Sequence, residues 1–152
     1  MAGKRKSAHL VAFFAGKKHA KFEKTLVRAL FLAFSVLGKG PVACEVHCIS
    51  DRESAALNRK FRGKKEGPAT VLSFPADPAF PRPDIPKKAR FLGEIYLAPD
   101  MIARKGEWPL PRYAVHGALH LLGYTHEAQS DRIEMESLEG AIAALFAREK
   151  VL

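Results

Sequence analysis

The sequence contains few cysteines and no long apolar run, and both features limit the classes of protein to which it can belong. Only two of its 152 residues are cysteines, Cys44 and Cys48. On a strand, this spacing would separate them by about 13 Å, which is too far for a disulfide bond. No apolar stretch approaches the roughly 20 residues that a membrane-spanning helix needs. We therefore expect a cytoplasmic protein with two buried, reduced thiols.

Acidic residues are also scarce relative to basic ones. Asp and Glu number 16 against 25 Lys and Arg, so the formal net charge is +9. The first 30 residues hold eight basic side chains and a single acidic one, Glu23. A basic surface attracts polyanions, of which nucleic acid is the commonest. A basic tail over 1–8, which we expect to be disordered, and a solvated helix face would give the same excess, so charge alone leaves nucleic acid open.

Apolar periodicity predicts one mixed domain over 9–152. The expected strands are 9–15, 43–50, 70–75 and 91–98; the expected helices are 18–37, 51–61, 112–122 and 130–148, with a short one opening at Pro99. Asp51 is the predicted N-cap of the second helix. This order predicts an α+β (mixed α/β) fold, in which a mixed sheet of about four strands packs with about five helices.

Three histidines follow one another at a spacing typical of a metal site. In VHGALHLLGYTH they are His116, His120 and His126. Four residues of helix advance about 6 Å and complete little more than one turn, so the first two imidazoles share a face and can reach one ion. Gly123 permits the left-handed backbone that ends a helix, after which the chain can bring the third histidine back. We expect one Zn²⁺ per chain, although three imidazoles also accept nickel or iron.

The residue after the first histidine bears on the chemistry. The long protease motif with this histidine spacing has glutamate there as general base, whereas this chain has Gly117. Three neutral imidazoles leave the charge of the ion uncompensated and one coordination position open. Such a site polarises a substrate oxygen and lowers the pKa of a bound water towards about 7. A phosphodiester suits both effects, so the residues favour a metal hydrolase over a peptidase.

Beyond the histidines, three stretches resemble one known family. HGALHLLGYTH (116–126), LNRKFRGKKEGPATVLSFP (57–75) and FLGEIYLA (91–98) are similar to segments of the YbeY family of bacterial proteins. The resemblance implies a zinc-dependent, single-strand-specific endoribonuclease. It implies a role in rRNA maturation, notably at the 3′ end of small-subunit rRNA, and in ribosome quality control. Single-stranded RNA and the small ribosomal subunit are the partners implied, and the oligomeric state is left open.

The resemblance assigns roles position by position. His116, His120 and His126 fall on the metal ligands of the family, and Arg62 falls on its functional arginine. A guanidinium there would stabilise charge that develops on a phosphate, so we expect Arg62 to be catalytic. From the residues alone, a surface arginine paired with a nearby glutamate is an equal alternative.

Other matched positions and departures surround these residues. Glu94 falls on a Gly-Asp/Glu pair and lies in an apolar strand, so it needs a partner. It is a candidate general base or support for a metal ligand, with a structural salt bridge as the alternative. Met135 and Glu139 match positions on the last helix. Thr125 stands where the family usually has aspartate, and 68–70 is Pro-Ala-Thr where the family has Pro-Thr-Asn.

Further candidate contacts to RNA lie close to the catalytic arginine. They are Arg59, Lys60, Lys64, Lys65 and Ser73. The basic ones would hold backbone phosphates without reading sequence. A hydroxyl satisfied by the backbone is the alternative for the serine. Phe61 and Phe74 could stack on bases, and core packing is the alternative for both.

Two other functions stay open at this point. One is a ribosome-assembly factor that binds RNA and holds a structural metal, with Cys44 or Cys48 as the fourth ligand that a closed site normally has. The other is a metallopeptidase, against which Gly117 counts. For the nuclease, attack by water and attack by the RNA 2′-hydroxyl are both compatible with these residues.

Overall fold

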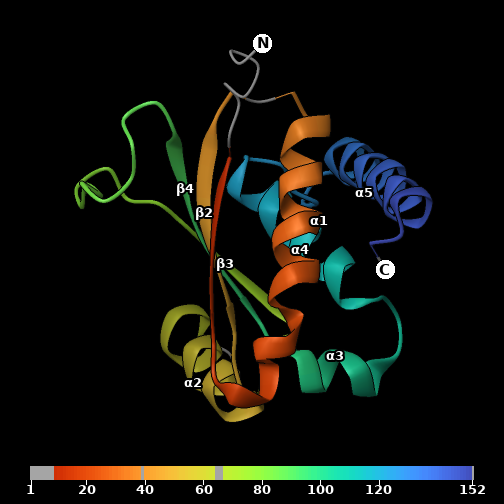
Figure 1. The fold of residues 1–152 in the computed structure, drawn as a ribbon. Coiled ribbons are helices and arrows are strands. Elements are labelled where there is room, and N and C mark those ends of the chain that lie inside the picture. The colour runs from red at the N-terminus through yellow and green to blue at the C-terminus, as the bar shows by residue number, and fades with distance from the viewer. Residues whose placement is uncertain (1–8, 39, 64–66, 152) are drawn as a thin grey trace.

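The computed structural model describes residues 9–38, 40–63 and 67–151, and Figure 1 shows their arrangement. The strands are β1 (Leu10–Ala15), β2 (Val42–Cys48), β3 (Val71–Pro75) and β4 (Arg90–Leu97). The helices are α1 (Glu23–Val36), α2 (Asp51–Arg62), α3 (Pro99–Lys105), α4 (Leu110–Leu121) and α5 (Gln129–Glu149), preceded by a 3-10 helix, η2 (Lys17–Phe22). The basic tail predicted over 1–8 lies outside the described residues.

The four strands form one mixed sheet in the order β1-β2-β4-β3. β1, β2 and β4 are parallel, and β3 runs antiparallel to β4. α1 and α4 pack on one face of this sheet, and α5 packs against both of them (Figure 1). The prediction of an α+β fold with a mixed four-stranded sheet and five α-helices is confirmed over the described ranges. No helix within those ranges combines the length and apolar character that a membrane crossing requires.

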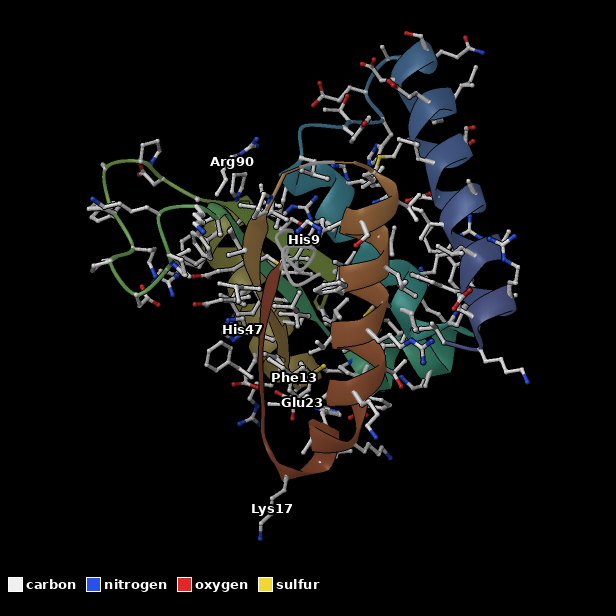
Figure 2. All side chains as sticks on the ribbon, turned by 45° about the horizontal axis from the view of Figure 1, so that its top comes forward. His9, Phe13, Lys17, Glu23, His47 and Arg90 are labelled. Carbon is white, nitrogen blue, oxygen red and sulfur yellow. The ribbon has the colours of Figure 1, made fainter. Side chains whose placement is uncertain are left out.

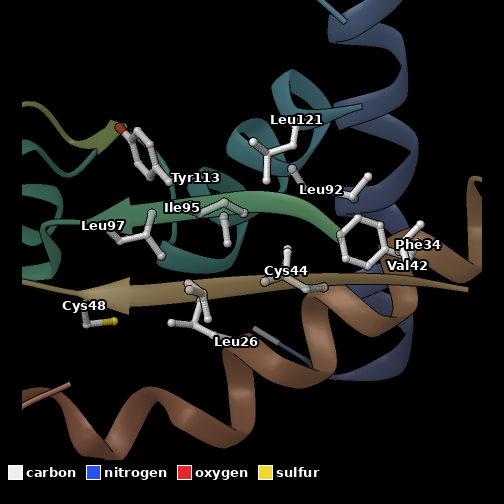
Figure 3. Packing of buried hydrophobic residues seen from close by; sticks show 14 of the residues in the cluster. Leu26, Phe34, Val42, Cys44, Cys48, Leu92, Ile95, Leu97, Tyr113 and Leu121 are labelled. Carbon is white, nitrogen blue, oxygen red and sulfur yellow. The ribbon is translucent and has the colours of Figure 1, made fainter. Parts of the chain in front are cut away.

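The hydrophobic core lies between the sheet and the helices α1 and α4 (Figure 3). Cys44, Val46 and Cys48 of β2 point into it, because alternate residues of a strand share a face. α1 contributes Leu26 and Phe34, both fully buried. β4 and α4 contribute Leu92, Ile95, Leu97, Tyr113 and Leu121. This packing fixes α4, which carries two of the three histidines, against the sheet.

Cys44 and Cys48 are buried free thiols, as predicted. Burial raises the pKa of each thiol to about 12, and the charge of Glu45 adds to the shift at Cys44. Because the thiolate is the reactive form, we expect iodoacetamide at about pH 8 to leave both cysteines unmodified in the folded protein. Both should be alkylated in denaturant, as counted by mass spectrometry. Rapid alkylation of the folded protein would contradict their placement in the core.

The first helix differs from the prediction, which began it at residue 18. The segment Lys17–Phe22 is a 3-10 helix, and α1 begins only at Glu23. Three lysines occupy this segment, and positive charge is unfavourable at the start of an α-helix, whereas the carboxylate of Glu23 is favourable there. His19 anchors the segment, because its buried ring lies 3.2 Å from the Asp100 carboxylate.

Two helix starts also differ from the prediction. Ser50, and not Asp51, is the N-cap of α2, because the Ser50 hydroxyl accepts from the Glu53 amide while the Glu53 carboxylate accepts from the Ser50 amide. α4 begins at Leu110, two residues before the predicted 112. Pro111 is accommodated there because the first turn of a helix needs no amide donor from it. The other predicted elements agree within two residues.

Candidate metal centre

The last two turns of α4 place His116 and His120 on one face of the helix. Their rings lie edge to face with centroids 4.7 Å apart, and their Nε2 atoms are 3.1 Å apart. Two nitrogens bound to one tetrahedral zinc ion would be separated by about 3.3 Å. The spacing of four residues thus brings the two imidazoles to a single point, as the sequence predicted.

The turn after α4 returns the third histidine to that point. Gly123 has φ +102°, a conformation that side chains rarely adopt, and the Tyr124 amide donates to the carbonyl of Leu119. The reversed chain sets the ring of His126 5.0 Å from that of His120. One ligand nitrogen from each of the three histidines lies within 4.8 Å of the others. This group could hold a metal ion.

Acceptors behind the rings decide which nitrogen faces the centre. Nδ1 of His116 lies 2.5 Å from Oε2 of Glu139, and Nδ1 of His120 lies 3.0 Å from the carbonyl oxygen of Tyr124. Each Nδ1 therefore donates its proton to an oxygen, and each Nε2 of a neutral ring carries a lone pair. Such hydrogen bonds orient metal-bound histidines in proteins.

The distance between the two facing ring nitrogens shows whether the histidine centre suits a cation. The Nε2 atoms of His116 and His120 lie 3.1 Å apart, and two lone pairs at that distance repel unless a proton or a metal ion lies between them. Burial, followed by the neighbouring His116 and His126, lowers the pKa of His120 below its ordinary value. A neutral ring is thereby favoured over a protonated one. The donor set fits a divalent metal.

The sequence did not predict that a carboxylate of the last helix would be the hydrogen-bond partner of His116. Glu139 comes from α5, and it is almost fully buried, with 3% of its surface exposed. The carboxylate expected to support a ligand or act as a base, Glu94, lies elsewhere: it faces away from α4 and accepts from the Tyr96 hydroxyl at 2.7 Å. Its neighbour Ile95 is the residue that faces α4. The structure therefore does not bring Glu94 to the histidines.

Two cavities share the histidines. The larger, of about 410 Å³, is lined by all three and by Arg62 and Ser73. The smaller, of about 300 Å³, is lined by His116 and His126 together with Trp108, Arg112, Arg132 and Glu139. The guanidinium of Arg112 lies 4.4 Å from the centroid of the Trp108 ring. The centre is therefore flanked by cationic side chains on both sides, and the sequence reasoning found only the side of Arg62.

Gly117 is required by packing. A Cβ atom at this position would lie 2.9 Å from the side chains of both Ile95 and Ser73, and 3.2 Å from that of Val71. α4 can approach β3 and β4 this closely only without a side chain here. A glutamate at residue 117, the base of the protease motif, therefore has no room.

The remaining predicted contacts are placed as follows. Ser73 lines the larger cavity, and its hydroxyl donates to the carbonyl of Gly117 at 3.1 Å, so the backbone satisfies it. Arg59 and Lys60 are exposed on the last turn of α2. Lys64 and Lys65 lie outside the described residues. Thr125 donates to the Asp131 carboxylate at 3.2 Å, which ties the turn that precedes the third histidine to the first turn of α5.

Fold and site together define a mixed α+β protein in which three histidines that could hold a metal ion lie between two cavities, each lined by at least one arginine. Comparison with known proteins makes this class specific. The family model described as endoribonuclease YbeY matches residues 14–147. The chain therefore belongs to the YbeY family, as its motifs predicted.

Individual relatives agree with this assignment. An endoribonuclease YbeY of Rhodopseudomonas palustris is 37% identical over 134 residues, which are 82% of this chain and 69% of the relative. That of Parvibaculum lavamentivorans is 37% identical over 139 residues, covering 82% of this chain and 74% of the relative. A solution structure of a Thermotoga maritima protein, 23% identical, has the same fold, with a TM-score of 0.56 over 93% of this chain and 95% of that one.

Proposed function

We propose that this protein is a metal-dependent endoribonuclease that cuts single-stranded RNA at the three-histidine centre. The observation that carries the proposal is the convergence of three imidazoles beside Arg62 in one open cavity. Membership of the endoribonuclease YbeY family supports RNA as the substrate. The excess of basic residues, 25 against 16 acidic ones, is consistent with a polyanion.

The side chains around the centre would divide the work as follows. A bound metal ion would supply Lewis acidity towards a phosphodiester oxygen and lower the pKa of a coordinated water molecule. Glu139 and the carbonyl of Tyr124 hold two of the imidazoles in the orientation that presents Nε2. Arg62 can bind the scissile phosphate through two parallel hydrogen bonds and offset charge that develops there. Arg112 faces the second cavity, where it can hold the adjoining phosphate.

Zinc is the metal we propose, because three imidazoles and an open position are typical of catalytic zinc. We further propose small-subunit rRNA, near its 3′ end, as the physiological substrate, and the small ribosomal subunit as partner. Both follow from the family resemblance. A structural metal is the weaker alternative, because Cys44 and Cys48 point into the core and no fourth ligand joins the three histidines among the residues that the structure describes.

A substrate panel tests the proposed function. Purified wild-type protein should cut a labelled single-stranded RNA internally, and should leave duplex RNA of the same sequence and casein intact. The ends of the products distinguish the two modes of attack, since a 2′,3′-cyclic phosphate implicates the RNA hydroxyl. Cleavage of casein without cleavage of RNA would overturn the proposal in favour of a peptidase.

Arg62→Ala should lower the rate of RNA cleavage about a hundredfold, because one donor to a developing negative charge is lost. Arg62 is exposed at the end of α2, so the melting temperature should change little. Arg52→Ala, which removes an exposed arginine from the first turn of the same helix, is the matched control and should cut at the wild-type rate. Equal rates for the two variants would remove Arg62 from the mechanism.

A further inference from the structure

A row of five aromatic side chains crosses the sheet. It comprises Phe14 of β1, His47 of β2, Tyr96 of β4, Phe74 of β3 and Phe61 at the end of α2. Neighbouring ring centroids in this row lie between 4.5 and 5.6 Å apart. The rings follow the order of the strands in the sheet, one ring from each strand, and the row ends on a helix. We call these five residues the aromatic row.

The aromatic row lies on the face of the sheet opposite α1 and α4. Figure 2 shows His47 on one side of the sheet and Phe13 on the other, towards α1. The register supports this placement, because His47 pairs directly with Phe14 and with Tyr96, and paired residues share a face. Phe74 follows Ser73, whose hydroxyl reaches α4, and so points the opposite way.

Three rings of the row form a stack that ends on an exposed ring. Phe14, His47 and Tyr96 are nearly parallel, with angles of 15° and 16° between neighbouring planes. β1 is an edge strand, and Phe14 is 46% exposed. At the other end of the row, Phe61 is 56% exposed. A stack that ends on an exposed ring can be extended by another flat aromatic group, and a nucleobase is such a group.

The row begins at the rim of the histidine cavity. Phe61 is followed directly by Arg62, and Phe74 lies between Ser73 and Pro75; Arg62, Ser73 and Pro75 all line that cavity. An RNA strand held at Arg62 would therefore meet the first two rings of the row as it leaves the centre over the β3 edge. This continuity favours RNA over an unrelated ligand on the opposite face.

Charge at the ends of the row complements a nucleic acid. The ammonium of Lys60 lies 5.2 Å from the centroid of the Phe61 ring. Lys17, which follows β1 beyond Phe14, extends into solvent (Figure 2). Exposed lysines at both ends can pair with backbone phosphates while the exposed end rings, Phe14 and Phe61, contact bases.

A small cavity beside Phe74 has the chemistry of a base pocket. It measures about 240 Å³ and is lined by three aromatic rings, those of Phe74, Phe80 and Phe91, together with Arg82 and Glu94. A carboxylate such as that of Glu94 can accept from the amino group of a cytosine. Flat apolar walls with a few polar groups at their edges suit a base.

The carboxylates on this face restrict where phosphates can lie. The Glu45 carboxylate is bound by Arg82 at 2.7 Å and by His47 at 3.1 Å, and Glu94 accepts from the Tyr96 hydroxyl. Arg82 also binds Asp84 at 2.7 Å, and Asp77 lines the small cavity. Acidic groups would repel phosphates placed directly above them. They therefore favour a path in which bases contact the exposed end rings, Phe14 and Phe61, and phosphates lie towards the lysines.

We propose that the aromatic row marks a track for single-stranded RNA, which continues from the metal centre onto the opposite face of the sheet and stacks bases on the exposed end rings, Phe61 and Phe14. The inference rests on the proposed function, since it takes RNA as the substrate. It predicts that the protein binds a long strand more tightly than a short one, because only the long strand reaches Phe14.

Binding to a 20-nucleotide and a 6-nucleotide single-stranded RNA tests the track. The measurements use His120→Ala protein, so that the RNA stays intact, and fluorescence anisotropy. Adding Phe14→Leu and Phe61→Leu should weaken binding of the 20-mer about tenfold for each ring, since leucine keeps apolar bulk but removes the stacking surface. The 6-mer should lose less. Phe31→Leu, which replaces a phenylalanine on α1 that is 39% exposed, is the matched control and should bind both RNAs unchanged.

A second readout reports stacking itself. 2-Aminopurine placed along the 20-mer should lose fluorescence on binding, and the quenching should disappear at the position that Phe14 contacts once leucine replaces it. Cleavage of the 6-mer by the wild-type protein distinguishes the RNA track from the proposed nuclease activity. If that RNA is cut, but Phe14→Leu and Phe61→Leu bind the 20-mer as tightly as Phe31→Leu, the track is overturned and the nuclease stands. If no RNA is cut or bound, both fall together.

Discussion

His120→Ala protein should cut single-stranded RNA no faster than buffer alone, the largest effect that we expect from any single substitution. The centroid of the His120 ring lies 4.7 Å from that of His116 and 5.0 Å from that of His126. Its removal leaves two ligands, too few to hold zinc tightly. Single-turnover cleavage of a labelled RNA, with the metal content of the same sample, measures the loss.

A second histidine controls for damage to the fold. His19 of η2 is buried, whereas His120 is half-buried, and the His19 ring contacts the carboxylate of Asp100 in α3. His19→Ala protein should have a lower melting temperature, but it should bind metal and cut RNA as the wild type does. If His120→Ala cut RNA as fast as His19→Ala, the histidine centre could not be the active site.

Glu139→Gln should weaken metal binding about 10- to 100-fold, the second large effect. Its carboxylate accepts the Nδ1 proton of His116 at 2.5 Å and makes Nε2 a stronger donor to a metal. Glutamine has nearly the same shape but carries no charge, so the substitution tests the charge with little change in packing. Competition with a chromophoric chelator measures the affinity, and RNA cleavage should fall in parallel at limiting metal.

The neighbouring Glu136 provides the comparison for that experiment. It is exposed, lies on the same helix and lines the same cavity as Glu139. Glu136→Gln should therefore bind metal as tightly as wild type. Should both variants bind metal equally well, the hydrogen bond to His116 would have no part in tuning the centre.

The convergence of the three histidines could be predicted because it depends on local geometry. Helical periodicity alone places His116 beside His120, and Gly123 alone permits the turn that returns His126. The N-cap of α2 was equally local. Ser50 followed three residues later by Glu53 is a capping-box signature, so this sequence signal could have corrected the assignment to Asp51.

Glu139 could not be predicted in its role, because nothing local connects it to the histidines. It lies 23 residues after His116, and the contact exists only because α5 packs against α4. Glu94 shows the opposite case. Period-two alternation in β4 places it on the face away from Ile95, so its distance from the centre could be inferred once Ile95 was known to face α4.

The aromatic row also depends on the order of the strands. Phe14, His47, Phe74 and Tyr96 are far apart in the sequence, and only the order β1-β2-β4-β3 brings their rings into contact. Sequence reasoning noted Phe61 and Phe74 as possible base-stacking residues. The sequence alone does not predict that one ring from each of the three other strands continues the row.

A metal titration tests the central claim most directly. Protein freed of metal with a chelator receives zinc in small steps, and bound metal and the rate of RNA cleavage are measured at each step. We predict that both rise together and level off at one ion per chain, and that His120→Ala shows neither increase. Full cleavage by the metal-free protein, with no further gain as zinc binds, would contradict the account.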